Sequence, residues 1–582
     1  MGREPFTEAT RPSTKLNIKI LYCSKVVMAS TPDITARPTP CLQKGVELYP
    51  YQTKVIEWMK AREKANPIYN RGISGGMVCL KMGLGKTFAA LEHSLRSQSV
   101  KKELCPTLIV ASKTVLYEWK NQGIEKFYQN IKALYFHKDF LGDYINHITA
   151  AEILEYNIVI TTYDQCLSAS RKHDAHKLVC EYGQEGIHKD KVIAIHVRKK
   201  PPYKPAVKGP VNLYQIPWNR IFLDESPRIA NPKTYTFKAV MALYGQHKWC
   251  LTGTVFRNCD NDIWSQLRFC GYNTITTARL WRRWYFKDQN LQQYMYVSNY
   301  TEAKVTMPEK IEHIHYVDMD PDQKLTYQAL LVETQDLYER MLMKFISYAS
   351  VLAMFTRLRQ VCISPYLIVA KSKNGIIQEG IDKALIQTKV DKWIADSEGS
   401  AGIDSPKIKK IIEIIQSVPK GEKIVIFSMF VKCLELVEKA IQTDLSNVSY
   451  EFLDGRCTGQ ERVDILTNFK EDPDVTVLLV HYKVGGEGIN LPEGNHVLCI
   501  EPWWSPAVHN QGIARCWRRG QKKPVHVYWV ITRKTIEQPI LKMCANKDQL
   551  ADFYLYGEEY NPQPTGLTKY EMQKLLGIAA TM

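Results

Sequence analysis

The sequence predicts an α/β protein made of two lobes, each a parallel sheet with helices on both faces. The chain has 582 residues, which is too long for a single hydrophobic core. Short β-branched runs recur between helical stretches, and several of them end in polar residues. Continuous apolar runs of this kind are typical of parallel sheets buried on both faces. Such sheets bind their ligands at the carboxyl ends of the strands.

These runs are the expected strands, taken in chain order. In the first half they are residues 77–80, 107–111, 158–162, 220–223 and 249–251. In the second half they are residues 423–427, 475–480, 496–500 and 525–531.

The same pattern predicts the domain boundaries. The expected parts are an N-terminal extension 1–40, a first lobe 41–266, a helical and aromatic linker 267–405, a second lobe 406–545 and a tail 546–582. We expect the linker aromatics, including Tyr294, Tyr327 and Tyr338, to pack helices together rather than to stack on bases.

A basic, proline-bearing insertion at 168–215 interrupts the first lobe. It contains Arg198, Lys199 and Lys200, followed by two prolines. Its position between two expected strands predicts a surface loop or hairpin. A contact with DNA and a purely solvated loop are equally compatible with this composition.

Composition favours a polyanionic partner. Lysine and arginine number 77 against 60 acidic residues, which gives a net charge of +17 and a pI near 9.0. Such a charge suits nucleic acid, although solubility alone would also explain it. The 15 cysteines include no CxxC pair, which argues against a zinc ribbon and for a reducing compartment. No apolar run reaches the roughly 18 residues of a membrane span, so we expect an intracellular protein without zinc or membrane contact.

The segment MGLGKT, residues 82–87, predicts a phosphate-binding loop. Gly83 and Gly85, on either side of Leu84, allow backbone amides to face phosphates at the start of a helix. Lys86 would neutralise the outer phosphates, and Thr87 could hold Mg²⁺. Leu80 occupies the position where the full loop spacing has a glycine. A helix that begins at a glycine turn and binds no ligand is the alternative.

Asp224 and Glu225 follow an expected strand directly. One carboxylate suits the magnesium shell, and its neighbour could activate the attacking water. An isolated Asp-Glu pair would more often be solvated. Here the pair lies between the glycine loop and the segment Leu251-Thr252-Gly253-Thr254, as a nucleotide-coupled motor requires.

In the second half, Gln511, Arg515 and Arg518 have helical spacings that predict one shared helix face. Two guanidinium groups aimed at a γ-phosphate would stabilise transition-state charge, and they could act only when the lobes close. An ordinary basic helix face is the alternative. The glycine-rich run 485–490, upstream of this helix, favours the catalytic interpretation.

Ordered motifs along the chain resemble the Swi/Snf family of superfamily-two helicase-like ATPases, from about Leu48 to Ile540. In chain order they are LYPYQ 48–52, MGLGKT 82–87, TLIVASKTVLYEW 107–119, ITTYD 160–164, IFLDESPRIANPKT 221–234, LRQVCISPYL 358–367, LDGRCTGQER 453–462, and VGGEGINL 484–491 with its following helix. The resemblance implies two RecA-like lobes. It also implies that Gln52 reads adenine, that Gly488 belongs to the nucleotide site, and that 107–119 touches one DNA strand.

The activity implied by this resemblance is ATP hydrolysis coupled to movement along double-stranded DNA. ATP and Mg²⁺ would be required, and DNA would be held mainly through its phosphate backbone. Displaced protein on DNA is a further expected partner. The expected location is the nucleus or another DNA-containing compartment, possibly viral. A strand-separating DNA or RNA helicase acting in transcription, and a nucleic-acid-binding scaffold with a decayed ATPase, are the alternative functions.

The sequence departs from the family pattern at several points. Leu80 and Lys81 replace an acidic pair, Pro227 and Trp517 each replace a histidine, and Val255 replaces a proline. The residues expected to perform the chemistry, including Lys86, are retained. We therefore expect an active ATPase whose coupling to DNA is altered, chiefly at Pro227.

Overall fold

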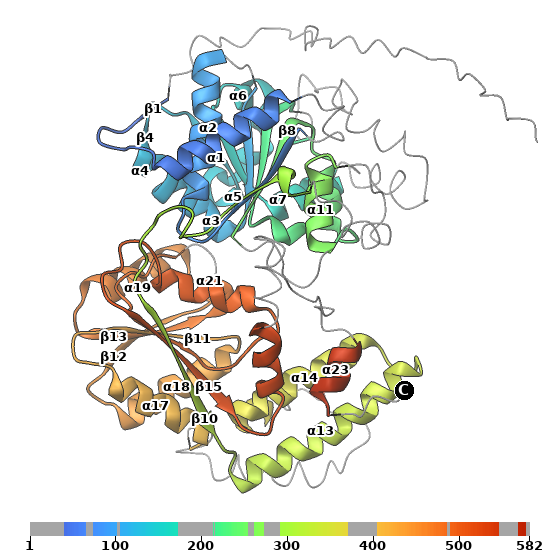
Figure 1. The fold of residues 1–582 in the computed structure, drawn as a ribbon, viewed down its shortest axis with the longest axis vertical. Helices are drawn as coiled ribbons and strands as arrows, with labels where there is room; N and C mark the ends of the chain where they lie inside the picture. Colours follow the sequence, from blue (N-terminus) through green and yellow to red (C-terminus); the bar gives the residue numbers. More distant parts are fainter. Residues whose placement is uncertain are drawn as a thin grey trace, which may run out of the picture.

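Two parallel sheets organise the chain, and the lobes built around them face each other (Figure 1). The structure is a computed structural model. It describes residues 40–65, 74–101, 105–172, 213–214, 216–253, 261–272, 291–369, 404–485, 489–545 and 569–577.

The first sheet has seven strands, in the order β5-β6-β3-β7-β8-β2-β9, and every neighbouring pair is parallel. In that order the strands are Ala133–Phe136, Ile158–Thr162, Thr107–Ala111, Trp218–Asp224, Gly245–Thr252, Gly75–Leu80 and Met295–Ser298. All five strands expected in this lobe are present. Because they are parallel, the glycine loop after β2 and the acidic pair after β7 lie at the same edge of the sheet.

The second sheet has six strands, in the order β10-β15-β14-β11-β13-β12, again with every pair parallel. In that order the strands are Lys310–Val317, Val525–Thr532, His496–Cys499, Ile424–Ser428, Val475–His481 and Ser449–Leu453. The four strands expected here are present. The predicted fold class, two parallel-sheet lobes with flanking helices, is confirmed.

Successive residues of each central strand enter opposite hydrophobic cores. In the first sheet, Met77, Leu108 and Leu223 pack into one core, whereas the adjacent residues Val78, Ile109 and Phe222 pack into the other. Burial on both faces explains why these strands read as continuous apolar runs.

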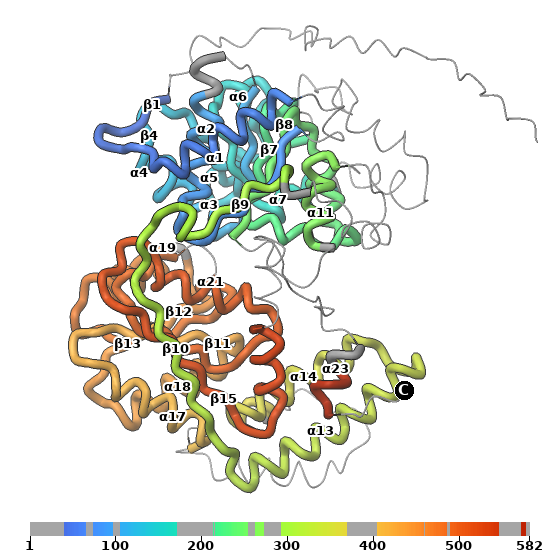
Figure 2. Tube along the Cα trace, viewed as in Figure 1, coloured from blue at the N-terminus to red at the C-terminus, as the bar shows by residue number. Residues whose placement is uncertain are grey.

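The linker region is less helical than expected. Strand β9 completes the first sheet and β10 forms an edge of the second, and the segment between them passes from one lobe to the other (Figure 2). The burial of β10 alternates between exposed and intermediate, so its sequence, KIEHIHYV, lacks a strong apolar signal. Its assignment depends on eight paired positions with β15, which lies far away in the sequence.

The rest of the linker contains a helical hairpin, α13 (Pro321–Leu342) and α14 (Tyr348–Ile363). Tyr327 and Tyr338 are buried in its core, which confirms packing rather than base stacking for these two rings. A later helix, α23 (Lys569–Leu575), contributes Met572 and Leu575 to the same core. No helix in the described parts of the chain is long and apolar enough to cross a membrane.

Candidate active site

The glycine loop lies between the end of β2 and the start of helix α2 (Lys86–Lys101). Gly83 and Gly85 have φ angles of +79° and +77°, a left-handed conformation that side chains disfavour. A Cβ atom on Gly85 would also lie 2.6 Å from Nε2 of Gln52. Both glycines are therefore needed for the path of this loop.

The Lys86 ammonium lies within the loop. Its Nζ donates to the backbone oxygen of Leu80 at 3.3 Å. A Cβ on Gly253, after β8, would lie 3.2 Å from the same nitrogen. Lys86 thus sits between the glycine loop and the end of β8, and Thr87 follows it on the first turn of α2.

Helix α1 (Pro50–Lys64) connects the entry motif to this loop. The side-chain oxygen of Gln52 accepts a hydrogen bond from the backbone nitrogen of Tyr49 at 3.0 Å. The Tyr51 hydroxyl donates to the backbone oxygen of Leu84 at 3.1 Å. The start of α1 therefore fixes one side of the glycine loop.

The acidic pair ends β7 in a constrained geometry. Asp224 is buried, and its two carboxylate oxygens accept from the Trp119 indole at 2.7 Å and from the Glu225 backbone nitrogen at 2.9 Å. Burial, and then the neighbouring Glu225 charge, raise the pKa of Asp224 to about 6. Glu225 itself has a φ of +46°, an uncommon backbone conformation for a non-glycine residue that costs about 1–3 kcal/mol. Sequence reasoning missed Trp119 as a partner of this pair.

Helix α21 (Pro506–Cys516) brings the second lobe to the acidic pair. Gln511 Nε2 donates to Glu225 Oε2 at 3.3 Å. One turn later, Arg515 Nη1 lies 4.0 Å from Glu118 Oε1 in the first lobe and donates to the Ile489 backbone oxygen at 3.3 Å. Burial raises the pKa of Glu118, and the positive charges of Arg515 and Arg518 oppose that rise.

The prediction that Arg518 shares a helix face with Gln511 and Arg515 is wrong, because α21 ends at Cys516. The backbone dihedral angles of Trp517 are not helical, so the chain leaves the helix at this residue. The Trp517 indole donates to the Pro308 backbone oxygen at 2.8 Å. Arg518 lies in the following turn. Burial, and then the charge of Arg515, lower its pKa, so Arg518 is still close to Arg515.

A further arginine crosses between the lobes and was not predicted. Arg519 Nε donates to the Gly83 backbone oxygen at 3.1 Å, and its guanidinium lies 4.7 Å from the centre of the Tyr49 ring. The only sequence signal for this residue was its place in the run CWRRG, four positions after Arg515.

Some predicted residues cannot be compared with the structure. Gly488, Val255 and the basic run 198–200 lie outside the described residues.

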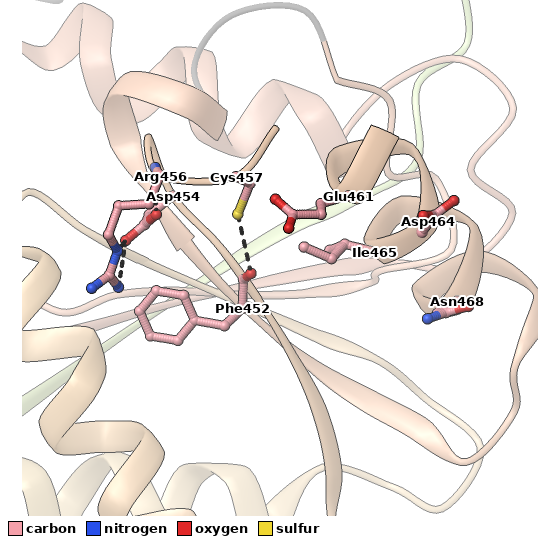
Figure 3. A pocket seen from close by; sticks show the side chains of 8 residues that line it. All are labelled: Phe452, Asp454, Arg456, Cys457, Glu461, Asp464, Ile465 and Asn468. Carbon is pink, nitrogen blue, oxygen red and sulfur yellow. Dashed lines mark hydrogen bonds and ion pairs between the residues drawn. The ribbon is translucent and has the colours of Figure 1, made fainter. Parts of the chain in front are cut away.

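An open depression of about 460 Å³ on the second lobe lies elsewhere, beside β12 (Figure 3). Three carboxylates contribute to its lining and would repel phosphate, and none of the predicted nucleotide-site residues takes part. Its lining is Phe452, Asp454, Arg456, Cys457, Glu461, Asp464, Ile465 and Asn468.

Comparison with protein families agrees with this geometry. The model of the SNF2-related domain matches residues 51–367, and the helicase conserved C-terminal domain matches residues 406–520. The chain belongs to the SNF2-related family of helicase-like ATPases. The first match covers the first sheet of this SNF2-related ATPase and continues through β10 and the helical hairpin, and the second match covers strands β11 to β14 of the second sheet.

Several relatives align along most of this SNF2-related ATPase. A putative helicase, 172L, of Invertebrate iridescent virus 6 is 40% identical, over 92% of this chain and 96% of its own length. The putative ATP-dependent helicase/translocase YwqA of Bacillus subtilis is 25% identical over 92% of this chain, which spans 51% of YwqA. The chromatin-remodeling complex ATPase ISW2 of Saccharomyces cerevisiae is 24% identical over 89% of this chain, which spans 42% of ISW2.

Among solved structures, the SWI2/SNF2 ATPase core of Sulfolobus solfataricus is 23% identical. The alignment covers 92% of this chain and 98% of that one, with a TM-score of 0.35.

The SNF2-related site offers suitable oxygen ligands for Mg²⁺ beside the glycine loop. The Asp224 carboxylate keeps lone pairs beyond its two hydrogen bonds, and the Thr87 hydroxyl follows Lys86 on the first turn of α2. Carboxylate and hydroxyl oxygens are the kind of ligand that Mg²⁺ takes together with nucleotide phosphates.

Proposed function

We propose that this SNF2-related ATPase is a double-stranded DNA translocase that uses ATP hydrolysis to move along DNA or to displace protein bound to it. The observation that carries the proposal is that helix α21 and the turn that follows it contact two parts of the first lobe. Gln511 bonds to the acidic pair and Arg519 bonds to the glycine loop. Hydrolysis in such a cleft requires both lobes and is therefore coupled to their relative movement.

Each residue of the cleft then has a role. Lys86 and the loop amides from Gly83 to Thr87 bind the phosphates, and Thr87 with Asp224 would hold Mg²⁺, which supplies charge neutralisation at the phosphates. Glu225 orients and activates the attacking water, and Gln511 holds the Glu225 carboxylate in position. Arg515 and Arg518 stabilise the negative charge that develops in the transition state.

Two observations support duplex DNA as the substrate along which the protein moves: the net charge of the chain and the names of its relatives. The net charge of +17 favours phosphate contacts. The relative ISW2 is named as a chromatin-remodeling ATPase and YwqA as a putative translocase. The chain spans 51% of YwqA and 42% of ISW2, so the comparison concerns only those parts of the two relatives.

A location in a DNA-containing compartment follows from the same proposal. Viral proteins are among the relatives: the 172L protein, and a probable global transactivator of a polyhedrosis virus that is 26% identical over 85% of this chain. They support a viral setting for this motor.

The deciding experiment is steady-state ATP hydrolysis by the purified protein without nucleic acid and with single-stranded DNA, duplex DNA or RNA. A Glu225→Gln variant serves as the control. We expect duplex DNA to stimulate turnover most, and the variant to lose it. Stronger stimulation by RNA or single strands would favour a helicase instead. Equal turnover by both proteins would mean that the site is inactive and the protein is a scaffold.

A further inference from the structure

The peptide group between Asp224 and Glu225 is held from two sides. Its carbonyl oxygen accepts a hydrogen bond from the buried Tyr163 hydroxyl at 2.7 Å. Its nitrogen donates to the Asp224 carboxylate at 2.9 Å. This peptide precedes the left-handed residue Glu225, whose φ is +46°. Because φ describes the rotation between this peptide and the Cα atom, the two hydrogen bonds fix the direction in which the Glu225 side chain leaves the backbone.

The left-handed conformation of Glu225 needs support from its surroundings. Residues with a Cβ atom disfavour it, and it persists where neighbouring groups enforce it. Strand β7 ends on one side of Glu225, and the short 3-10 helix η4 (Ser226–Ile229) begins on the other. Without the bond from Tyr163, the peptide could rotate toward ordinary backbone angles. The Glu225 carboxylate would then move away from Gln511, its partner in the second lobe.

Tyr163 is placed as a rigid donor. It is the first residue of helix α7 (Tyr163–Lys172) and directly follows strand β6. Strand β3 separates β6 from β7 in the sheet, so the side chain reaches across the end of β3. Its ring packs in a hydrophobic core of the first lobe. Burial holds the pKa of Tyr163 well above its usual range, so the hydroxyl keeps its proton and can donate it to the carbonyl.

We propose that Tyr163 is a positioning residue for ATP hydrolysis, whose hydroxyl holds the Asp224–Glu225 peptide so that the Glu225 carboxylate faces the attacking water. Tyr163 is 2% exposed, so it acts through Glu225 and not on the nucleotide. The Asp224 carboxylate has its own bond from Trp119, so this proposed Mg²⁺ ligand keeps its place when the Tyr163 hydroxyl is removed. The loss should therefore fall on turnover and spare nucleotide binding. This inference rests on the proposed function, in which Glu225 activates the water.

The test is Tyr163→Phe, which removes only the hydroxyl. Nucleotide affinity is measured with ATP that carries a fluorescent ribose label, and turnover is measured as single-turnover hydrolysis with duplex DNA. We expect turnover to fall by about 10- to 100-fold, which is part of the roughly 10²- to 10⁴-fold that a well-placed general base contributes. The ATP dissociation constant should stay close to the wild-type value. In the Glu225→Gln background, Tyr163→Phe should lower the residual turnover by less than about twofold, because the base on which Tyr163 acts is already gone.

Tyr214→Phe is the matched control. Tyr214 is fully buried in the same core, and its hydroxyl donates to the backbone oxygens of Cys166 and Ala239 rather than to the acidic pair. Each variant loses a buried hydroxyl while the carbonyl partner remains, so thermal unfolding should show a similar loss of stability in both. Only Tyr163→Phe should lose turnover.

The outcomes distinguish this inference from the function on which it rests. Wild-type turnover by Tyr163→Phe, an equal loss in Tyr214→Phe, a matching loss of ATP affinity, or a full additional loss in the Glu225→Gln background would overturn the positioning role. Absence of ATP hydrolysis by the wild-type protein, or full turnover by Glu225→Gln alone, would overturn the proposed function instead.

Discussion

The indole nitrogen of Trp119 donates to Asp224 Oδ2 at 2.7 Å, deep inside the first lobe. Trp119 directly follows helix α3 (Lys113–Glu118), in the segment 107–119 that is expected to touch one DNA strand. Glu118, the last residue of that helix, faces Arg515 of the second lobe. A displacement of α3 by DNA would therefore reach both sides of the cleft through adjacent residues.

We expect Trp119→Phe to uncouple DNA binding from hydrolysis. The substitution keeps a large ring but removes the hydrogen bond to a charged carboxylate, which is worth about 1.5–3 kcal/mol. The stimulation of ATP turnover by duplex DNA should fall by about tenfold. Trp218→Phe is the matched control, since Trp218 is also buried but donates to the Leu213 backbone oxygen at the other end of β7. Equal loss in both variants would point to general destabilisation instead.

Removing either arginine to which we assign transition-state stabilisation should separate nucleotide binding from turnover. We expect Arg515→Ala and Arg518→Ala to bind ATP nearly as well as the wild type but to hydrolyse it roughly 10³-fold more slowly, because the lost charge acts mainly in the transition state. Single-turnover hydrolysis and nucleotide binding are measured in parallel. Normal turnover by Arg518→Ala would show that this residue, which lies beyond the end of α21, has no such role.

The basic run 198–200 in the insertion predicts how strongly the affinity for duplex DNA depends on salt concentration. If Arg198, Lys199 and Lys200 contact phosphates, replacing all three with alanine should weaken binding to duplex DNA. The slope of log affinity against log salt should also fall by about 2 to 3, since each lost phosphate contact removes about 0.9. Affinity is measured by fluorescence anisotropy at several salt concentrations. An unchanged slope would indicate a solvated loop without a DNA contact.

We expect the buried Glu501 carboxyl group to make the free energy of unfolding depend on pH. It is fully buried at the end of β14, and this burial raises its pKa from 4.5 to about 7, despite hydrogen bonds from Ser428 and the Met429 backbone. A carboxyl group whose pKa is raised by folding stabilises the folded protein at pH values below its pKa in the unfolded chain. This stabilisation is lost as the pH rises through the folded-state pKa of about 7. The unfolding free energy relative to Glu501→Gln should therefore decrease by about 2–3 kcal/mol between pH 5 and pH 8. Urea unfolding of both proteins at each pH tests this, and a constant difference would contradict it.

Lys407 and Glu537 form an ion pair that is fully buried in the second lobe. The Lys407 ammonium lies 2.7 Å from both carboxylate oxygens, and Glu537 also accepts from the Thr532 backbone nitrogen. Lys407→Met would leave the carboxylate buried without its counter-charge, so we expect a loss of about 3–5 kcal/mol in unfolding free energy. Adding Glu537→Gln, which keeps an acceptor for Thr532, should restore much of that loss. No recovery in the double variant would mean that packing, rather than charge, explains the effect.

The central strands could be predicted because each carries its own signal. Met77 and Val78, like Ile221 and Phe222, fill cores on both faces of one sheet, so these runs are apolar without alternation. The edge strands gave no such signal. In β10, Ile314 and Tyr316 remain 46% and 42% exposed, and only pairing with β15 defines the strand.

By itself, the sequence determined the two-lobe α/β fold, the SNF2-related family, and the glycine loop and acidic pair, because each depends on local composition or short spacing. Only the tertiary structure decided which groups meet across the cleft. Trp119 reaches Asp224 across 105 positions, and Arg519 reaches Gly83 across 436. Such contacts leave no periodicity in the chain. They depend on how the parallel strands order themselves and on where α21 ends, and these are properties of packing between distant segments.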